Sequence, residues 1–245
     1  MTVPTMISLK ERTALITGAS SGVGRALALE LAALGAVVML LARTPQKLES
    51  VAQEIRRSGG VAQTHTVDLT EDAALHRFSG EFQIRHSGLD FLIHSAGIFR
   101  HGALASAPLA EFDDLYRVNV RAPVALTQLL LPQLMAARGT VVFINSTAGV
   151  TTHANVGPYA ASKHALKAVA DTLRLENSAQ GLRVMSVMLG RTATPMQQEV
   201  CRLEGSVYDA SKFLRPEDVA RTIVHALTLP DSAELTDLYI RPTRQ

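Results

Sequence analysis

The stretch "TALITGASSGVG", residues Thr13–Gly24, decides the expected fold. Its first five residues are apolar or β-branched, as in a buried strand, and an apolar-periodic segment, "RALALELAAL", follows at once. Between the two, Gly18, Gly22 and Gly24 have the spacing G-x-x-x-G-x-G. Glycines permit a tight turn from strand to helix, and they let a pyrophosphate approach the backbone amides at the helix N-terminus. The stretch therefore predicts a dinucleotide-binding loop, with a plain glycine turn as the alternative.

The same alternation of strand and helix recurs along the whole chain. Most of the strand-like runs are continuously apolar, as in a parallel sheet that is covered on both faces. The expected strands are Thr13–Thr17, Ala36–Ala42, Val61–Val67, Leu89–Ser95, Gly139–Ser146, Leu182–Leu189 and Leu235–Ile240. This pattern predicts an α/β fold, a doubly wound Rossmann-type parallel sheet of about seven strands with helices on both faces. Without a linker, a fixed-period repeat or a low-complexity tract, we expect a single domain over residues 1–245.

Composition and charge exclude several classes of protein. The chain of 245 residues is 47% hydrophobic and 19% charged, so it can bury a large core and is not disordered. Its formal net charge of +2 is spread along the chain, which argues against nucleic-acid binding as the main role. Cys201 has no partner for an intramolecular disulfide, which favours a reducing, cytoplasmic compartment. The eight histidines are dispersed and form no ligand motif, so we expect no metal site.

The sequence favours neither secretion nor membrane insertion. The first residues lack the charged region, apolar core and cleavage site of a secretory signal. The most membrane-like stretch, Ala26–Ala42, is shorter than the roughly 20 residues of a spanning helix, and it contains Glu30 and Gly35. It is better explained as a helix, a glycine turn and a buried strand.

The end of the second expected strand bears on which dinucleotide is bound. An acidic residue there would bind a ribose 2′-hydroxyl, whereas this strand continues as "LLARTPQK", with Arg43 after Ala42. A guanidinium makes paired, charge-assisted bonds to phosphate. The sequence therefore favours NADP(H) over NAD(H), with a solvated Arg43 at the start of the next helix as the alternative.

Further motifs follow the glycine loop in a fixed order. They are "HSAG" at His94–Gly97, "NV" at Asn119, "INSTAG" at Ile144–Gly149 and "YAASK" at Tyr159–Lys163. With them the chain resembles the short branch, of about 250 residues, of the short-chain dehydrogenase/reductase family, over essentially its whole length. The resemblance implies an NADP(H)-dependent oxidoreductase acting on a small-molecule carbonyl or secondary alcohol. It also implies a homodimer or homotetramer that pairs through the apolar segment Val124–Ala137.

The resemblance also assigns a catalytic role to four residues. Tyr159 would be the acid/base, Lys163 its partner, Ser146 the hydroxyl that polarises the substrate carbonyl, and Asn119 the holder of a water in a proton relay. Tyr159 and Lys163 are spaced i,i+4, which places both on one face of a helix. We expect the Lys163 ammonium, together with an oxidised nicotinamide, to lower the pKa of the Tyr159 phenol.

Cofactor contacts are implied by the same resemblance. Asp68 in "VDLT" would contact the adenine, Gly97 would lie near the cofactor, and Thr194 would bind the nicotinamide carboxamide. The full set of expected cofactor-binding residues is Gly18, Ser20, Ser21, Gly22, Val23, Gly24, Arg43, Asp68, Leu69, Ala96, Gly97, Asn119, Tyr159, Lys163, Gly190, Thr192 and Thr194.

Some positions depart from the family pattern. His94 and Ser95 replace the usual pair of asparagines, Leu189 replaces a proline, and the C-terminal "YIRPTRQ" replaces a glycine pair. These changes affect the bonds that support the strand, the turn before Gly190 and the C-terminal contacts.

The segment 191–214 follows the expected strand Leu182–Leu189 and is expected to be a substrate lid. Within it, Arg202 and Tyr208 either touch substrate or face water. His153 is expected to border the substrate pocket, and His164 to point away from the catalytic face.

Two other functions remain open at this point. The first is a catalytically silent dinucleotide-binding regulator on the same fold, since fold does not fix function. The second is a related enzyme that uses the nucleotide for epimerisation or dehydration, which the loop spacing and chain length disfavour. The complete set of Asn119, Ser146, Tyr159 and Lys163 favours the dehydrogenase over the regulator. The substrate is not determined by any of these motifs.

Overall fold

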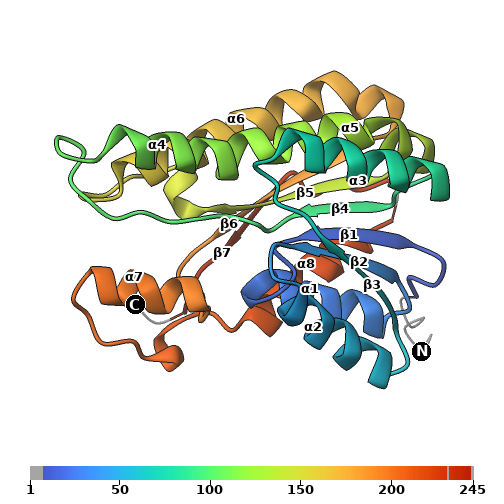
Figure 1. The fold of residues 1–245 in the computed structure, drawn as a ribbon, viewed down its shortest axis with the longest axis horizontal. Coiled ribbons are helices and arrows are strands. Elements are labelled where there is room, and N and C mark those ends of the chain that lie inside the picture. The colour runs from blue at the N-terminus through green and yellow to red at the C-terminus, as the bar shows by residue number, and fades with distance from the viewer. Residues whose placement is uncertain (1–7, 231, 244–245) are drawn as a thin grey trace.

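A parallel sheet forms the centre of the computed structural model, which describes residues 8–230 and 232–243 (Figure 1). Its strand order is β3-β2-β1-β4-β5-β6-β7, and every pair is parallel. The strands are β1 (Thr13–Thr17), β2 (Val37–Ala42), β3 (Val61–Thr66), β4 (Phe91–His94), β5 (Thr140–Ser146), β6 (Arg183–Leu189) and β7 (Asp237–Ile240). The doubly wound, Rossmann-type sheet is thus confirmed. The expected strands after β1 were each one to three residues too long.

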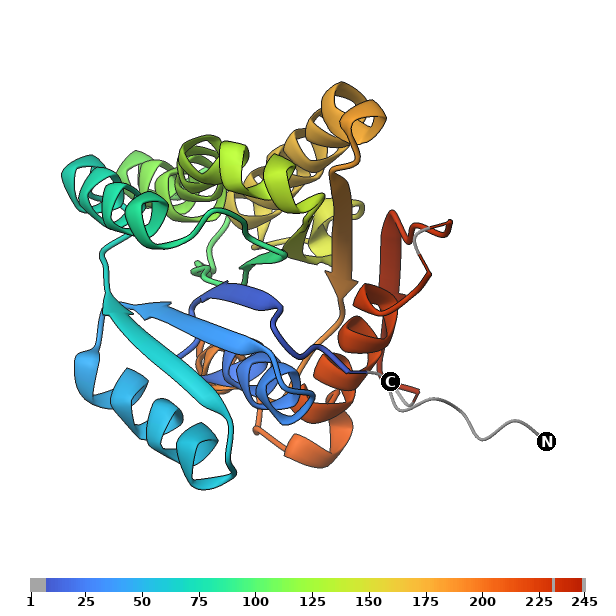
Figure 2. The same ribbon diagram turned by 90° about the vertical axis from the view of Figure 1, so that its right-hand side faces the viewer.

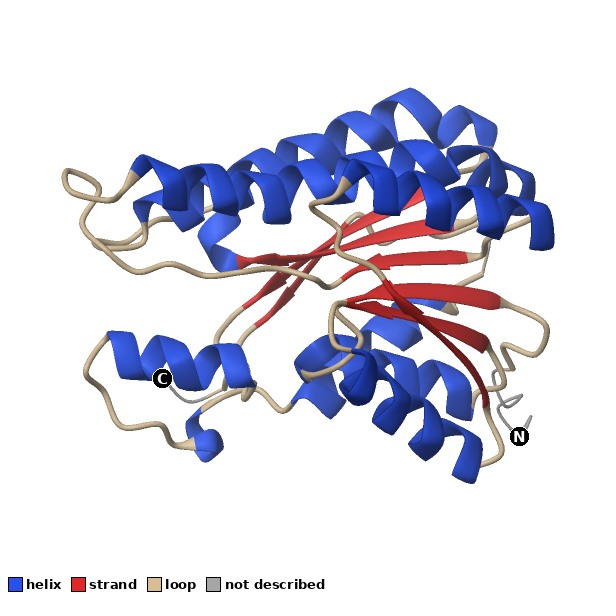
Figure 3. Ribbon diagram, viewed as in Figure 1, coloured by secondary structure: helices blue, strands red, loops and turns tan. Residues whose placement is uncertain are grey.

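Helices cover both faces of this sheet (Figures 1 and 3). One layer consists of α1 (Gly22–Ala33), α2 (Pro45–Arg57) and α8 (Pro216–Leu227). The opposite layer consists of α3 (Asp72–Arg85), α4 (Leu109–Tyr116), α5 (Ala122–Ala137) and α6 (Gly157–Asn177), with α7 (Pro195–Leu203) set apart from both layers. A π-helix at Arg117–Arg121 joins α4 to α5, and short 3-10 turns lie at Thr147–Gly149, Ser178–Gln180 and Ala210–Lys212.

Buried apolar side chains form two clusters, one on each face of the sheet, and β1 shows how they divide. Ala14 and Ile16 pack with the α1 and α8 side chains, whereas Leu15 packs with those of α3, α5 and α6. Successive side chains of a strand point to opposite faces, so a strand buried on both faces has to be apolar throughout. This is why the strands appear as continuous apolar runs in the sequence.

The carboxyl ends of the central strands meet at one edge of the sheet. Thr17 at the end of β1 is aligned with Leu41 on β2 and with His94 on β4. The chain winds in one direction from β1 to β3 and in the other from β4 to β7, so the switch point lies between β1 and β4. Ligands of open α/β sheets bind in the crevice at such a point. Figure 2 shows the twist of the sheet, with β3 and β7 at its two outer edges.

Within residues 8–230 and 232–243, no helix is both long and apolar enough to cross a membrane. The apolar stretch from Ala26 to Ala42 forms most of α1, a turn with Gly35 at φ +95°, and strand β2.

Candidate active site

The glycine loop makes the tight turn between β1 and α1 that its spacing predicted. Gly18 and Gly22 have φ values of +66° and +55°, the left-handed region that favours glycine. A Cβ at Gly18 would lie 2.8 Å from the backbone of Ala96, and one at Gly24 would lie 2.5 Å from the Gly18 carbonyl oxygen. The loop therefore folds against the end of β4, and it brings the N-terminus of α1 to the switch point of the sheet. Of the other loop residues, Val23 is buried, Ser20 is half-buried and Ser21 is exposed.

Thr17 and His94 form hydrogen bonds at the end of β4, where the family pattern has two asparagines and this chain has His94 and Ser95. The Thr17 hydroxyl oxygen accepts hydrogen bonds from the backbone N–H groups of Ser95 and Ala96, at 3.1 and 3.2 Å. The His94 Nε2 lies 2.8 Å from the Thr127 hydroxyl on α5, and its ring stacks on Phe143. Complete burial lowers the pKa of His94 to about 3, so this histidine is neutral at physiological pH. A neutral, bonded histidine thus anchors the end of β4 where the family pattern has an amide.

Arg43 and Asp68 follow the ends of β2 and β3, at the same edge of the sheet as the glycine loop. The Ala19 N–H donates to the Leu41 carbonyl at 3.3 Å, which ties the loop to the end of β2, just before Arg43. Arg43 is exposed. Asp68 accepts hydrogen bonds from the backbone and the hydroxyl of Thr70, which lower the pKa of its carboxyl, and the Arg43 charge lowers it further. Leu69 is partly buried against the core cluster on the α3 side.

Ser146 ends β5 and is held there by its neighbours. Its Oγ accepts a hydrogen bond from the Ala148 N–H at 3.1 Å, and its own N–H donates to the Asn145 Oδ1 at 2.8 Å. Asn145 is buried, and its Nδ2 donates to the Lys163 carbonyl oxygen at 3.1 Å. One buried amide therefore links the strand that carries Ser146 to the helix that carries Lys163.

Tyr159 and Lys163 lie together on α6, as their spacing predicted. The Lys163 Nζ is 5.9 Å from the centre of the Tyr159 ring and donates to the Ile144 carbonyl oxygen at 3.1 Å. The Ser146 hydroxyl lies close enough to the Tyr159 phenol to act on its pKa. The structure thus brings the predicted phenol, ammonium and hydroxyl together from two separate segments of the chain.

The pKa of Tyr159 differs from the sequence-based expectation. Burial raises it above its ordinary value, and the Ser146 hydroxyl acts in the opposite direction without outweighing burial. Burial also lowers the pKa of Lys163 to about 8, because desolvation disfavours the ammonium. In the chain by itself, burial therefore sets the direction of both shifts, and the effect of an oxidised nicotinamide, which the expectation included, stays a prediction.

Asn119 lies in the π-helix between α4 and α5 and is buried. Its Oδ1 accepts from the Ile98 N–H at 2.9 Å, and its Nδ2 donates to the Ile98 carbonyl at 3.0 Å and to the Ser162 Oγ at 3.1 Å. Both amide hydrogens are therefore used. A Cβ at Gly97 would lie 3.3 Å from the Asn119 Oδ1 and 3.8 Å from the Lys163 Nζ, which places Gly97 between these two side chains. Local π-helical bulges often occur at functional sites.

The segment after β6 returns to the glycine loop. A Cβ at Gly22 would lie 3.1 Å from the Thr194 Cγ2, so Thr194 lies directly beside the loop. Its hydroxyl oxygen caps α7 by accepting from the Gln197 N–H at 3.2 Å. Thr192 is buried, and its hydroxyl donates to the Gly190 carbonyl at 3.0 Å. Leu189 before Gly190 is in strand β6, whose last residues pair with β7.

The remaining sequence candidates lie farther out. Arg202 is exposed and paired with Glu199 in the same helix, while Tyr208 packs against the Phe213 ring at 5.5 Å between centroids. His153 is exposed in the loop before α6. His164 is exposed, and its Nδ1 lies 2.9 Å from the Ala160 carbonyl oxygen, whereas Lys163 beside it is buried. Over residues 8–230 and 232–243, no cluster of three or more histidine, cysteine or acidic side chains is arranged to hold a metal ion.

Sequence reasoning missed three residues of the site. Asn145 links Ser146 to Lys163, Thr17 holds the turn after β4, and the Phe99 ring packs edge-on against Tyr159 with 4.9 Å between centroids. Asn145 had a detectable signal, because it is the amide inside the otherwise apolar run "TVVFINS". Phe99 had none, since only the fold brings its loop onto Tyr159.

Comparisons with known proteins agree with this geometry. The family model described as "short chain dehydrogenase" matches residues 12–205. The chain belongs to the short-chain dehydrogenase family. It is therefore an oxidoreductase of this family, as the named reductases and dehydrogenases among its relatives support.

Individual members of the family are similar over nearly the whole chain. The sepiapterin reductase of Chlorobaculum tepidum is 31% identical over 239 residues, which are 94% of this chain and 95% of that protein. The glycine betaine reductase ATRR of Emericella nidulans is 33% identical over 96% of this chain, but this chain spans only 19% of that longer protein. A metagenomic short-chain oxidoreductase, solved in complex with NADP, has a TM-score of 0.83 and 31% identity, with 98% of this chain and all of that chain covered.

A nicotinamide dinucleotide fits the residues at this edge of the family fold. The loop from Gly18 to Gly24 is so closely packed that side chains at two of its glycines would collide with backbone. Such a loop presents amides and the positive end of the α1 dipole to a pyrophosphate. The Lys163 ammonium lies beside Gly97, directly after Ala96, whose backbone packs against Gly18 of this loop.

Proposed function

We propose that this chain is an NADP(H)-dependent oxidoreductase that interconverts a carbonyl compound and a secondary alcohol, with Tyr159 as acid/base. The observation that carries the proposal is the convergence of Ser146, Tyr159 and Lys163 beside the glycine loop. A hydroxyl, a phenol and an ammonium in this arrangement can bind a carbonyl oxygen, protonate it and restore the proton.

In the reductive direction, Tyr159 and Ser146 both act on the substrate oxygen. The raised pKa of Tyr159 keeps the phenol protonated at neutral pH, which is the form that donates a proton. The Ser146 hydroxyl donates a hydrogen bond to the same oxygen, so two donors stabilise negative charge as it develops. When bound, the dinucleotide supplies the hydride that reaches the carbonyl carbon. The oxygen then takes the Tyr159 proton, and the product is the neutral alcohol.

Lys163 stabilises the phenolate that Tyr159 leaves behind. With a pKa of about 8, its amine is mainly an ammonium at pH 7, and it lies close enough to the phenol ring to favour the charged form. An oxidised nicotinamide, when bound, would add a second positive charge that lowers the pKa of Tyr159. Asn119 lies next to Gly97 and Lys163, and we assign it a water of the proton relay, held by its main chain because its amide hydrogens are already bonded.

The preference for NADP(H) rests on Arg43. It is exposed at the end of β2, close enough to Asp68 to lower the pKa of that carboxyl, where a ribose 2′-phosphate of a cofactor on the glycine loop would lie. We assign Asp68 and Leu69 to the adenine. Gly190, Thr192 and Thr194 are assigned to the carboxamide end.

Two further features belong to the proposal. Residues 191–214 form a lid, held at its base by the Ala193 N–H, which donates to the Leu214 carbonyl at 2.8 Å. The chain forms a homodimer or homotetramer through the segment Val124–Ala137 of α5, and on the preceding helix α4 Leu109 and Tyr116 expose 81% and 50% of their surface.

The proposal is tested by turnover and cofactor binding in matched variants. Wild type is screened on a panel of ketones and alcohols by NADPH absorbance. Tyr159→Phe is expected to bind NADPH with nearly normal affinity and to lose turnover. Arg43→Ala is expected to raise the KM for NADPH at least tenfold and to leave the KM for NADH nearly unchanged, whereas Arg57→Ala, at the far end of α2, changes neither. Near-normal rates in Tyr159→Phe, or a clear wild-type preference for NADH, would overturn the assignment.

A further inference from the structure

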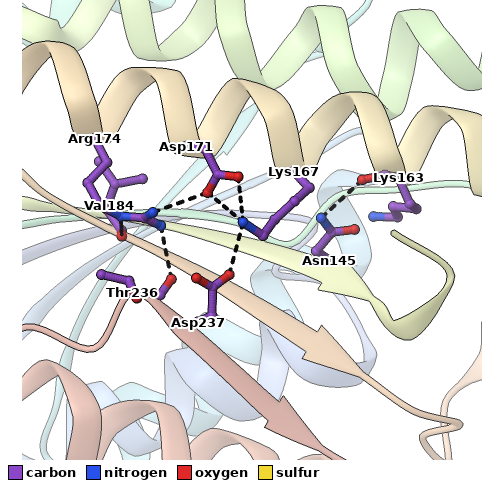
Figure 4. Close-up of polar contacts among 8 residues, drawn as sticks. All are labelled: Asn145, Lys163, Lys167, Asp171, Arg174, Val184, Thr236 and Asp237. Atoms are coloured by element: carbon purple, nitrogen blue, oxygen red, sulfur yellow. Dashed lines mark hydrogen bonds and ion pairs between the residues drawn. The ribbon is translucent and has the colours of Figure 1, made fainter. Parts of the chain in front are cut away.

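A polar stripe continues along α6 beyond the catalytic pair. Tyr159, Lys163, Lys167 and Asp171 are spaced four residues apart, and Arg174 follows one turn later, so the five side chains share one face of the helix. Figure 4 shows Lys167, Asp171 and Arg174 reaching from α6 toward the strands. A helix that packs on a sheet normally presents apolar side chains there, so the charged residues of this stripe call for a physical reason.

The stripe joins α6 to the last strand of the sheet. The Lys167 Nζ pairs with Asp171 at 2.5 Å and with the Asp237 Oδ1 on β7 at 3.2 Å (Figure 4). Arg174 donates to the Asp171 carboxylate at 3.1 Å and to two backbone carbonyls, those of Val184 on β6 and Thr236 beside β7, each at 3.0 Å.

These contacts are unlike the surface ion pairs of the molecule. The side chains of Lys167 and Arg174 are only 21% and 16% exposed, against 69% for Arg202 in a pair within α7. Although burial acts to lower the pKa of Lys167, the Asp171 and Asp237 carboxylates raise it above its ordinary value. Partly buried ion pairs gain little net stability over apolar packing, and in some proteins they specify one geometry between the elements that they join.

The stripe and the catalytic contacts hold the same helix. One turn before Lys167, the Lys163 carbonyl oxygen accepts from Asn145, and the Lys163 Nζ donates to Ile144 (Figure 4 shows the Asn145 bond). Strand β7 in turn ends beside Gly190, whose N–H donates to the Ile240 carbonyl at 2.9 Å. The C-terminal strand thus contacts both the catalytic helix and the start of the segment that leads to Thr194.

We propose that Lys167 and Asp237 are positioning residues, whose ion pair fixes the rotation of α6 about its axis and so the alignment of Tyr159 and Lys163 with Ser146. Apolar packing alone would let the helix turn slightly, whereas the ion pair and the two carbonyl contacts of Arg174 oppose rotation. This inference rests on the proposed function of Tyr159.

The expected size of the effect follows from helix geometry. Side-chain groups lie about 5–6 Å from a helix axis, so a rotation of roughly 10° moves them by about 1 Å. A misplacement of about 1 Å can lower a rate by about 10²-fold. Because the Asn145 and Ile144 contacts remain, we expect kcat to fall about 10- to 100-fold when the ion pair is removed.

The experiment compares Lys167→Met, Asp237→Asn and the double variant, with Lys167→Arg as the conservative replacement. Glu49→Gln, which removes an ion pair with Arg56 on α2, is the matched control. With a carbonyl substrate that wild type reduces, both single variants should lose kcat at least tenfold, and the double variant should be no worse than the poorer single. Lys167→Arg should recover kcat to within threefold of wild type. Glu49→Gln should retain full activity, and NADPH fluorescence titration should show affinities within about fivefold throughout.

A second readout needs no turnover. The Tyr159 pKa is measured from the ultraviolet absorbance of each variant minus that of its Tyr159→Phe counterpart. Rotation of α6 would expose the phenol, so the pKa should fall toward the ordinary value in Lys167→Met and stay raised in Lys167→Arg. This result distinguishes failure of the positioning role from failure of the proposed function, which shows instead as retained turnover in Tyr159→Phe or no turnover in wild type.

Three results would overturn the positioning role. They are kcat within twofold of wild type in both single variants, losses that multiply in the double variant, and an unchanged Tyr159 pKa. Ile223→Val in α8 provides a stability control, because Ile223 is buried on the opposite face of the sheet. If Ile223→Val lowers Tm as much as the Lys167 and Asp237 variants do and also loses as much kcat, the effect is due to stability alone and the positioning role is wrong.

Discussion

Replacing Lys163 by methionine should stabilise the protein while it inactivates the enzyme. Lys163 is 5% exposed, and burial lowers its pKa to about 8 from an ordinary value of 10.5. The unfolded chain therefore binds more protons than the folded one between these two values, so the free energy of unfolding rises with pH across this window and is lowest below pH 8. At about 1.4 kcal/mol per pKa unit, the buried ammonium costs about 3 kcal/mol at pH 7.

The methionine variant lacks this cost but also lacks one hydrogen bond. Loss of the Lys163 bond to the Ile144 carbonyl at 3.1 Å removes about 1–2 kcal/mol. We therefore expect the free energy of unfolding of Lys163→Met to exceed that of wild type by about 1–2 kcal/mol at pH 7. As the pH rises from 7 to 10, the free energy of unfolding of wild type should increase by about 2–3 kcal/mol relative to that of the variant.

Urea unfolding followed by circular dichroism measures this difference at several pH values, since the chain has no tryptophan. Ile223→Val, an apolar replacement in the core on the opposite face of the sheet, is the matched control. It removes no titratable group and no contact of α6, so wild type should exceed this control in free energy of unfolding by a constant amount from pH 7 to pH 10. A stability difference between wild type and Lys163→Met that stays flat over this range would refute the argument.

Two further substitutions test the glycine loop and the end of β4. Gly24→Ala should abolish NADPH binding, because the new Cβ would lie 2.5 Å from the Gly18 carbonyl oxygen. Gly80→Ala in helix α3 is the control, because a Cβ there meets nothing within 4 Å. It should raise the free energy of unfolding by about 0.5–1 kcal/mol and leave NADPH binding intact. Fluorescence titration and thermal unfolding check both, and NADPH affinity retained in Gly24→Ala would show that the loop can open. Because the pKa of His94 is about 3 in the fold and ordinarily 6.5, its contribution to stability should be lost as pH falls below 6.5. Wild type should lose about 2–3 kcal/mol relative to His94→Gln between pH 7 and pH 4.5, and parallel pH profiles for the two proteins would contradict this.

The fold could be predicted from the sequence because its signals are local. The apolar run of β1 and the glycine spacing of the loop after it each lie within a few consecutive residues, so they can be recognised without knowledge of the tertiary structure. The spacing of Tyr159 and Lys163 is equally local, since residues four apart share a helix face. The errors of one or two residues at a strand end include places where an apolar residue lies just outside the strand, as Leu89 does before β4 and Leu235 before β7.

The electrostatics of the site could not be predicted in the same way. The pKa values of Tyr159, Lys163 and His94 depend on how completely each group is desolvated, which is a property of the packed structure. Burial changed the expected direction for the tyrosine. Phe99 likewise reaches Tyr159 only because the loop after β4 folds over α6.

The amino-acid sequence alone determined the class of fold and the glycine loop, because both depend on the spacing and type of neighbouring residues. The resemblance of its motifs to a known family grouped Ser146 with Tyr159 and Lys163. Tertiary structure decided which partners those groups have: Asn145 between strand and helix, His94 on Thr127, and Lys167 on Asp237. These contacts join residues far apart in the chain, and their strength depends on exclusion of water. The register of the sheet decides which residues meet, and burial decides how strongly they interact. Neither can be predicted from local sequence patterns.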